Sequence, residues 1–298
     1  MEQLCDPKVV RSLLDRFHFR FSKELGQNFL IDPEVPQRIA ASCGADNTCG
    51  VVEIGPGFGV LTHELAKQAG KVVAIEIDQR LPPILAYTLR EHQNVKIVSG
   101  DVLKLDLPQL LRSEFGDGRV CVCANLPYYI TTPIIMALLE KKLPVESITV
   151  MVQKEVAQRL CAAPGEKEAG AISAAVHYYT RPQLLFTVPP QCFMPAPKVE
   201  SAVIRLEVRE RPPVEVRDEK LLFDIVRGAF AQRRKTFVNS LASSGVGVSK
   251  EQITEALRQL GLPENIRGER LTLEQLAAMT DFFGGQDKSA GNGKNLVK

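Results

Sequence analysis

The sequence predicts an α/β fold, in which a parallel sheet carries helices on both faces and a small all-helical domain follows. Three observations lead to this prediction. From about residue 50 onward, short apolar runs alternate with helix-like segments, a pattern typical of parallel sheets. At 298 residues the chain is long enough for two domains. After a charged, proline-containing break at residues 210–219, strand signals stop and helical spacing takes over.

Seven short apolar runs are predicted as strands. The stretches between the first five show helical spacing, for example LTHELAKQ and TTPIIMALLEKK. A proline-rich connection, VPPQCFMPAPK, separates the last two. The predicted strands are Val51–Ile54, Lys71–Ile75, Val95–Ser99, Arg119–Ala124, Ile148–Val152, Leu184–Val188 and Ala202–Val208.

The chain is expected to divide into four parts. Residues 1–22 form an N-terminal extension whose ordering the sequence leaves open, and residues 23–209 form the α/β domain. Residues 210–284 form the helical domain, because their apolar residues recur at helical spacing. Residues 285–298 are rich in glycine and lysine and are predicted to be a disordered tail.

The charge of the chain gives no overall indication of a nucleic-acid partner, because the formal net charge is only +2. Two stretches are locally basic: RFHFRFSK at 16–23, where cations alternate with phenylalanines, and AQRRKT at 231–236. Each can equally be a solvated face with a few buried rings. The sequence alone therefore leaves both interpretations open.

Composition argues against a membrane-spanning or secreted protein. No run approaches the roughly 18 apolar residues that cross a membrane, and the N-terminus MEQLCDPKVVRSLL lacks the apolar core of a secretory signal. The seven cysteines include no CxxC pair, and Cys121 and Cys123 fall on one face of a predicted strand. We therefore expect buried, reduced thiols in a cytoplasmic protein, with neither disulfides nor a metal site.

The loop after the first predicted strand, EIGPGFGV, has the composition of a cofactor loop. Gly55, Gly57 and Gly59 allow the backbone to turn tightly and to approach a ligand at the start of the next helix. A nicotinamide or flavin site would follow the pattern GxGxxG, but here the third glycine comes one residue early. Glu53 would repel a pyrophosphate and suits a cationic ligand.

Two further acids end the next two strands. Glu76, in VVAIEID, lies about 20 residues past the loop, where an acid can accept hydrogen bonds from both ribose hydroxyls. Asp101, in VSGDVLKL, can accept from an adenine amine beside the apolar Val102. Each acid alone could be a helix N-cap or a loop carboxylate. Together they lie on the carboxyl edge of one parallel sheet, where such folds bind ligands, and they predict an S-adenosylmethionine site.

The fourth strand delivers NLPYYI to the same edge. The amine of a nucleobase is a poor nucleophile because its lone pair is delocalised into the ring. Two acceptors, the Asn125 side-chain oxygen and the Leu126 carbonyl, would draw the nitrogen toward a pyramidal geometry and free that lone pair. Pro127 stiffens the turn, and Tyr128 offers a face for base stacking, worth roughly 1–3 kcal/mol. The alternative is a proline-containing turn with packed tyrosines.

The motifs ELGQNFLID, VVEIGPGFGVLT, EID, SGDVLKLD, NLPYYI and FMPAPKVESAV occur in this order. In this the chain resembles the small-subunit ribosomal RNA adenine N6,N6-dimethyltransferases, the KsgA/RsmA family, over residues 20 to 285. The resemblance implies a class I S-adenosylmethionine-dependent methyltransferase domain, Rossmann-like with a seven-stranded sheet, and a helical C-terminal domain. It implies transfer of four methyls to two adjacent adenosines in the 3′-terminal hairpin loop of small-subunit (16S) rRNA.

The resemblance also implies roles for residues that match the motifs. Asn28 and Leu30 would contact the cofactor together with Gly55, Glu76, Asp101 and Asn125. Phe193 would cover the second face of the target base. Arg233, Arg234 and Lys235 match a basic stretch that opens the rRNA-binding domain. We expect a monomer that acts within a pre-30S particle and needs neither a metal nor a membrane.

Two alternatives and one departure remain. A large-subunit rRNA adenine methyltransferase of the macrolide-resistance type shares the cofactor loop and a similar turn, although NLPYYI, GQNFL and FMPAPKVES favour the small-subunit enzyme. A non-enzymatic RNA-binding or assembly factor could keep the fold as a scaffold, although the complete set of acids argues against it. The proline pair in RLPPILAYTL leaves open how the helix after Glu76 begins.

Overall fold

The computed structural model describes residues 4–22, 24–232 and 234–290, which form two compact units. The sheet unit comprises the residues up to Ala157 together with Arg181–Val208. The helical unit comprises Gln158–Thr180 together with the residues from Arg209 onward. The sequence had assigned Gln158–Thr180 to the α/β domain, whereas their contacts group them with the C-terminal helices.

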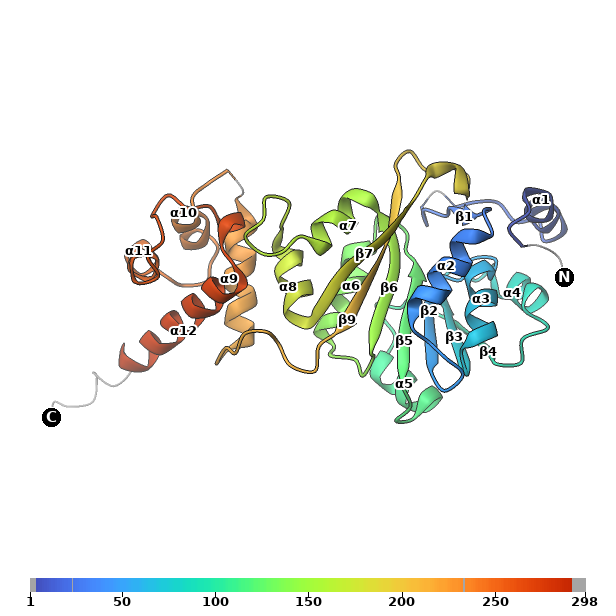
Figure 1. Cartoon of the computed structure of the whole chain (residues 1–298), viewed down its shortest axis with the longest axis horizontal. Coiled ribbons are helices and arrows are strands. Elements are labelled where there is room, and N and C mark those ends of the chain that lie inside the picture. The colour runs from blue at the N-terminus through green and yellow to red at the C-terminus, as the bar shows by residue number, and fades with distance from the viewer. Residues whose placement is uncertain (1–3, 23, 233, 291–298) are drawn as a thin grey trace. The chain divides into compact units, whose positions relative to one another are not determined.

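The sheet unit is built on a seven-stranded sheet with the order β4-β3-β2-β5-β6-β9-β7 (Figure 1). The strands from β4 to β6 pair in parallel, and β9 pairs antiparallel with β6. This confirms the predicted fold class. The strands are β2 (Gly50–Ile54), β3 (Lys71–Glu76), β4 (Val95–Ser99), β5 (Val120–Asn125), β6 (Ser147–Gln153), β7 (Thr180–Val188) and β9 (Ser201–Val208).

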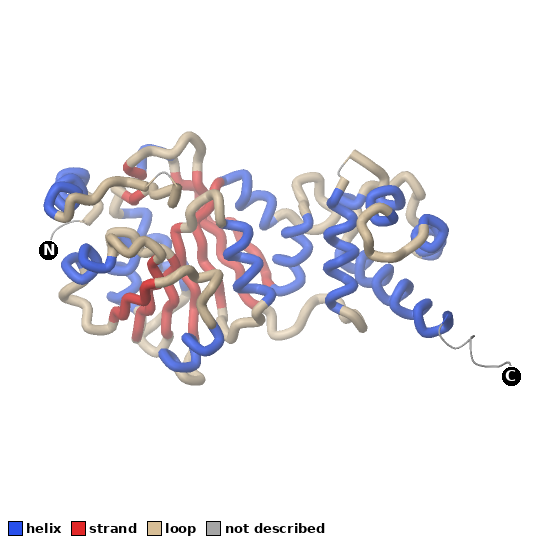
Figure 2. The backbone as a smooth tube through the Cα atoms, turned by 180° about the vertical axis from the view of Figure 1, so that it is seen from behind, coloured by secondary structure: helices blue, strands red, loops and turns tan. Residues whose placement is uncertain are grey.

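Helices lie on both faces of this sheet (Figures 1 and 2). The proline pair after Glu76 is accommodated because Pro82 and Pro83 occupy the first turn of α4, where no intrahelical N–H bond is lost. The helices of the sheet unit are α1 (Pro7–Arg16), α2 (Glu34–Cys43), α3 (Val60–Gln68), α4 (Pro82–Thr88), α5 (Leu107–Phe115) and α6 (Thr131–Glu140), and α7 (Lys154–Cys161) leads from it into the helical unit.

Two apolar clusters form part of the core of the sheet unit. The first packs α2 and α3 against the sheet through buried residues such as Ile39 and Leu65. The second is aromatic and includes Phe19, Phe29 and Phe58, with the last two rings stacked at a centroid distance of 4.1 Å. The basic, phenylalanine-rich stretch at 16–22 therefore places Phe19 in the core. All seven cysteines are free thiols.

A second, two-stranded sheet was not predicted. It pairs β1 (Phe29–Leu30) antiparallel with β8 (Phe193–Met194), which follows the 3₁₀ turn η1 (Pro190–Cys192). Strands of two residues have no periodicity that a sequence could display. This pairing joins GQNFL to FMPAPK, two motifs far apart in the sequence.

The helical unit contains α8 (Ala171–Tyr179), α9 (Glu219–Ala231), α10 (Phe237–Ala242), α11 (Lys250–Gln259), η2 (Gly268–Arg270) and α12 (Leu273–Ala290). Ala174 and Tyr178 of α8 lie in the same apolar cluster as the C-terminal helices, which explains why this segment groups with them. The backbone of α12 continues to Ala290, so the tail predicted to start at residue 285 is helical at first. Residues 291–298 lie outside the described part. None of the described helices is both long enough and apolar enough to cross a membrane.

Candidate active site

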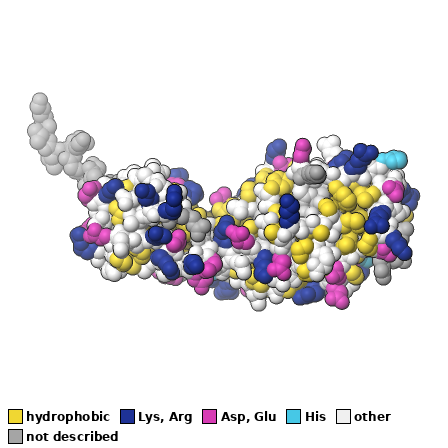
Figure 3. Space-filling view, turned by 90° about the horizontal axis from the view of Figure 1, so that it is seen from above, with side chains coloured by type: hydrophobic (Ala, Val, Ile, Leu, Met, Phe, Trp, Pro, Cys, Tyr) yellow, Lys and Arg dark blue, Asp and Glu magenta, His cyan; other side chains and the backbone are white. Residues whose placement is uncertain are grey.

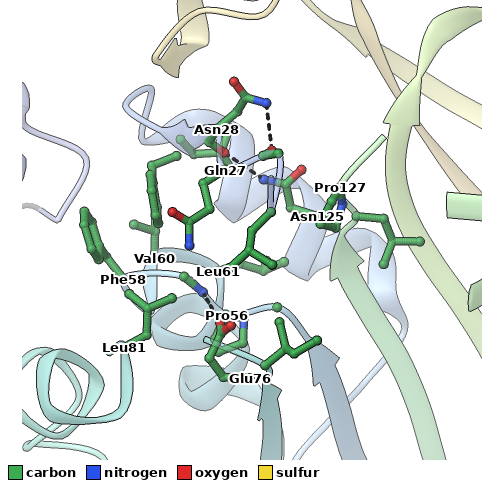
Figure 4. Close-up of a pocket in the computed structure, with 18 of the residues that line it drawn as sticks. Gln27, Asn28, Pro56, Phe58, Val60, Leu61, Glu76, Leu81, Asn125 and Pro127 are labelled. Carbon is green, nitrogen blue, oxygen red and sulfur yellow. Dashed lines mark hydrogen bonds between the residues drawn. The ribbon is translucent and has the colours of Figure 1, made fainter. Parts of the chain in front are cut away.

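One pocket of the sheet unit lies at the carboxyl ends of β2, β3 and β5 (Figure 4). It encloses about 880 Å³ of space between the protein atoms, open solvent at its mouth included. The pocket brings together ten residues predicted for the site: Asn28, Leu30, Glu53, Gly55, Gly57, Glu76, Asn125, Leu126, Tyr128 and Phe193.

Glu53 is the most deeply buried acid of this pocket, with 1% of its surface exposed. Its Oε2 atom accepts no hydrogen bond from any described residue, and the buried hydroxyl of Thr62 likewise has no partner among them. Burial raises the pKa of Glu53 to about 8, and the Glu76 carboxylate adds to this effect. The Thr62 hydroxyl lies close enough to oppose it, although it does not meet the geometry of a hydrogen bond. An unsatisfied buried acceptor is costly, so a ligand with a donor or a positive charge would relieve it.

The glycine loop supplies the space above these acids. Gly55 and Gly57 have φ of 71° and 59°, in the left-handed region that other residues rarely adopt. A Cβ on Gly57 would lie 2.8 Å from the Phe29 ring, whereas a Cβ on Gly55 would meet no atom within 4 Å. Gly57 is therefore required by packing, and Gly55 leaves open room in the pocket.

Glu76 ends β3 on the opposite side of the loop, with 4% of its surface exposed. Its Oε2 accepts from the Gly57 N–H at 3.4 Å (Figure 4). Its Oε1 accepts from the Asp78 N–H at 2.8 Å. Burial raises the pKa of this carboxyl group as well. Each carboxylate oxygen can accept a further bond, so Glu76 can still receive two neighbouring hydroxyl groups.

Asn125, the last residue of β5, has a defined amide orientation. Its Nδ2 donates to the Asn28 carbonyl at 3.4 Å, which directs Oδ1 away from that contact (Figure 4). The next carbonyl, that of Leu126, accepts no bond from the described residues, whereas the Pro127 carbonyl accepts from both Ile130 and Thr131. The turn thus leaves two neighbouring acceptors free, the Asn125 Oδ1 atom and the Leu126 carbonyl oxygen.

Three aromatic side chains line the pocket near this turn. Tyr128 forms a hydrogen bond with the Ser201 hydroxyl at 2.7 Å, and burial raises its pKa, so the phenol stays neutral and its ring is held in place. Phe193 is 3% exposed. Tyr129 is 58% exposed, and a Cβ on Gly26 would approach its ring to 3.3 Å.

Asp101 and Val102 are not among the residues that line the pocket. The Asp101 carboxylate accepts from the Leu103 N–H at 3.0 Å and lies 3.7 Å from the Lys104 ammonium, which is the loop-carboxylate alternative considered from the sequence. Val102 is buried. Contact of these two residues with a cofactor stays a prediction.

The predicted RNA-binding cluster belongs to the helical unit, between α9 and α10. Arg234 and Lys235 are exposed, and Arg233 lies outside the described residues. In the described ranges, no three His, Cys, Asp or Glu side chains are grouped so that they could hold a metal ion.

The sequence analysis missed several lining residues, among them Gln27, Phe58, Ile77 and Leu81. Gln27 and Ile77 sit inside the motifs GQNFL and EID, so their position beside predicted site residues was an available signal. Phe58 lies inside the cofactor loop EIGPGFGV, so its position was an available signal too. Leu81 is buried in the aromatic cluster, and nothing in the sequence separates it from an ordinary core residue.

The pocket fits S-adenosylmethionine in three respects. Glu53 is an unpaired buried acceptor that suits the ammonium group. Glu76 has room for two ribose hydroxyls, and Gly55 leaves the loop open to close approach of a ligand. The residues therefore match the cofactor that the sequence predicted.

Comparison with known proteins shows the family to which the chain belongs. The family model described as ribosomal RNA adenine dimethylase matches residues 18–283, most of the chain. The chain belongs to this family. Proteins named ribosomal RNA small subunit methyltransferase A are similar to it over nearly their full lengths. They come from Alkaliphilus metalliredigens (49% identical over 94% of this chain and 98% of the relative) and Lachnoclostridium phytofermentans (50% over 95% and 98%).

Solved structures of related proteins share the fold of this rRNA adenine dimethylase. The 23S rRNA methyltransferase ErmE has a TM-score of 0.67 and 26% identity, covering 86% of this chain and 99% of ErmE. A dimethyladenosine transferase from Plasmodium falciparum has a TM-score of 0.73 and 22% identity, covering 87% and 98%. The predicted class I methyltransferase fold is thereby confirmed. The higher identity to the small-subunit relatives disfavours the large-subunit alternative.

Proposed function

We propose that the protein dimethylates the N6 amines of two adjacent adenosines in the 3′-terminal hairpin loop of small-subunit rRNA, using S-adenosylmethionine. The observation that carries this proposal is the pair of free acceptors at Asn125 and Leu126, in a pocket that also holds an unpaired buried acid. Membership of the rRNA adenine dimethylase family and similarity to small-subunit methyltransferases support the substrate.

The two acceptors would act on the attacking amine. The Asn125 Oδ1 atom and the Leu126 carbonyl each accept one of its hydrogens and draw the lone pair out of the aromatic ring. As the nitrogen attacks it becomes positive, so both acceptors bind the transition state more tightly than the ground state. Because Asn28 fixes the amide orientation of Asn125, the acceptor is preorganised before the RNA arrives.

The cofactor would be held by the acids at the ends of β2 and β3. Glu53 receives the ammonium group and Glu76 receives the ribose hydroxyls, with close backbone approach at Gly55. When bound, the cofactor supplies a methyl group on a positively charged sulfur. Tyr128 and Phe193 line the same pocket and would stack on the two faces of the target base.

The helical unit would contact the rRNA phosphates through Arg234 and Lys235, and Arg233 is predicted to join them. The setting that the substrate implies is a pre-30S particle in the cytoplasm, where the protein would act as a monomer. No metal has a part in this scheme, because the amine attacks neutral and loses its proton afterwards.

Labelled S-adenosylmethionine incubated with undermethylated small subunits tests the proposal. Mass analysis of the digested rRNA should find dimethyladenosine at two neighbouring positions, and Asn125→Ala should remove it. Label in large-subunit rRNA would instead favour the macrolide-resistance type of enzyme. Binding of small subunits without any methyl transfer would favour an assembly factor.

A further inference from the structure

Asp78 lies just outside the cofactor loop and has no role in the scheme above. It is 6% exposed and follows Glu76 by two residues. Its carboxylate accepts from four donors: the Arg80 N–H at 3.1 Å, Arg80 Nε at 2.8 Å, Arg80 Nη2 at 2.6 Å and Gln27 Nε2 at 2.9 Å. A buried carboxylate with this many partners holds several groups in one arrangement.

One side of this network fixes Glu76. Because the Asp78 carboxylate accepts from the Arg80 N–H, it closes a tight turn over residues 78–80. That turn presents the Asp78 N–H to Glu76 Oε1 at 2.8 Å. The orientation of the proposed ribose acceptor therefore depends on a turn that the Asp78 side chain maintains.

The other side fixes the segment that carries Asn28. Gln27 is held at both ends of its amide, since Nε2 donates to Asp78 and Oε1 accepts from the Ser22 N–H at 2.9 Å. The neighbouring Asn28 carbonyl accepts from Asn125 Nδ2. Asp78 is thus linked through Gln27 to the residue that orients the proposed catalytic amide.

Arg80 completes the arrangement. Its guanidinium lies 4.7 Å from the centroid of the Phe19 ring, and Nη1 donates to the Arg20 carbonyl at 3.3 Å. The hydrogen bonds from Arg80 lower the pKa of Asp78, so the carboxylate is charged at neutral pH. The N-terminal segment therefore contacts the turn after β3 through this charged pair.

We propose that Asp78 is a positioning residue that aligns the cofactor acceptor Glu76 with the Gln27–Asn28 segment behind Asn125. This inference rests on the proposed function, because it assigns Asp78 an effect on cofactor binding and on turnover. Loss of the carboxylate leaves the half-buried amide of Gln27 without this acceptor and frees Glu76 to rotate. Cofactor affinity falls about tenfold, and turnover with saturating cofactor falls as well.

The chain offers a matched control in Asp46. Its carboxylate also accepts from the backbone N–H two residues ahead, at 2.8 Å, and from an arginine, Arg119, at 2.9 Å. It precedes β2 at the opposite end from Glu53 and does not line the pocket. Asp78→Ala and Asp46→Ala therefore remove the same kind of turn and an ion pair with an arginine, which is buried on the acid's side at Asp78 and half exposed at Asp46.

The test measures S-adenosylmethionine affinity by calorimetry, and turnover on undermethylated small subunits, for Asp78→Ala, Asp78→Asn, Gln27→Ala and the Asp78–Gln27 double variant. We expect weaker binding in Asp78→Ala, partial rescue in Asp78→Asn, which keeps an acceptor for Gln27, and a double variant no weaker than Asp78→Ala. Asp46→Ala should bind as the wild type does. Melting temperatures identify any variant that fails to fold. If Asp78→Ala does not fold, the affinity and turnover of Asp78→Asn test the positioning role instead.

Equal affinities and turnover for Asp78→Ala and the wild type (or for Asp78→Asn, where Asp78→Ala does not fold), or fully additive losses from Asp78 and Gln27, would overturn the positioning role. The failure of the proposed function has a different signature. In that case the wild-type protein itself would bind no S-adenosylmethionine or transfer no methyl group.

Discussion

The acids at the two ends of the central strands have opposite environments. At the amino ends, Asp46 and Glu146 are about half exposed and both pair with Arg119, at 2.9 and 2.8 Å. At the carboxyl ends, Glu53 and Glu76 are 1% and 4% exposed, and no described cation pairs with Glu53. The same sheet therefore satisfies its acids at one edge and leaves an acid unsatisfied at the other.

The pKa values follow this difference. Hydrogen bonds from Thr48 and Arg119 lower the pKa of Asp46 to about 2, and Arg119 lowers that of Glu146. Burial raises the pKa of Glu53 to about 8. Acids at the amino edge are ionised, and their hydrogen bonds and ion pairs are satisfied without a ligand. At the pocket edge, Glu53 lacks such a partner, and a bound cation would supply it. An unsatisfied buried group thus distinguishes the edge of the sheet that can bind a ligand from the edge whose acids are structural.

The largest effect is expected at Asn125. Asn125→Ala removes a preorganised acceptor of the developing charge and should lower turnover about 10²–10³-fold, while cofactor affinity falls only modestly. The first methylation should suffer more than the second, because a singly methylated amine has one hydrogen left and uses only one acceptor. Pre-steady-state counting of mono- and dimethyladenosine measures both steps. Equal losses in the two steps would contradict the two-acceptor account.

Glu76→Ala should have the next largest effect. It leaves two ribose hydroxyls without an acceptor and should weaken S-adenosylmethionine binding by roughly 1–3 kcal/mol. Glu146→Ala, at the amino edge, should leave binding unchanged. Calorimetry of the two variants tests whether only the acid at the pocket edge contributes to cofactor binding. Similar affinities for both variants would contradict this difference between the edges.

A smaller effect is expected in the helical unit. Replacing Arg233, Arg234 and Lys235 with Ala should weaken binding to small-subunit rRNA and flatten its salt dependence by up to about three counterions' worth, with cofactor affinity unchanged. Lys220, Arg227 and Arg258 of the same unit serve as the control, because each already pairs with an acid. If the salt slope stays the same, Arg233, Arg234 and Lys235 are a solvated face.

Much of the fold could be predicted from the sequence, because buried strands appear in it as short apolar runs. The predicted start of β7, Leu184, lies four residues after the observed start at Thr180. The missed part contains Pro182, and proline is unfavourable inside a sheet but tolerated at an edge, which is where β7 lies. The grouping of α8 with the C-terminal helices depends on long-range contacts of Ala174 and Tyr178. No local pattern encodes such contacts.

The site residues that lie at strand ends could be predicted, because the ends of strands can be located in the sequence. Glu53, Glu76 and Asn125 lie at the carboxyl ends of β2, β3 and β5, which are neighbours in the sheet, so parallel pairing brings them together. Asp101 also follows a strand, but its side chain binds the N–H of Leu103, and the sequence cannot show which way a loop carboxylate turns. The missing partner of Glu53 is a property of packing, visible only in three dimensions.

Proton release on cofactor binding tests the central claim, that a cationic ligand completes the pocket edge. With a pKa of about 8, ligand-free Glu53 is protonated at pH 6.5, and an ammonium beside it favours the carboxylate. Calorimetry in two buffers of different ionisation enthalpy should find nearly one proton released, and affinity rising up to about tenfold per pH unit below pH 7. Glu53→Gln should release none, and Glu146→Gln should behave as the wild type does. Equal release by the wild type and Glu53→Gln would contradict the account.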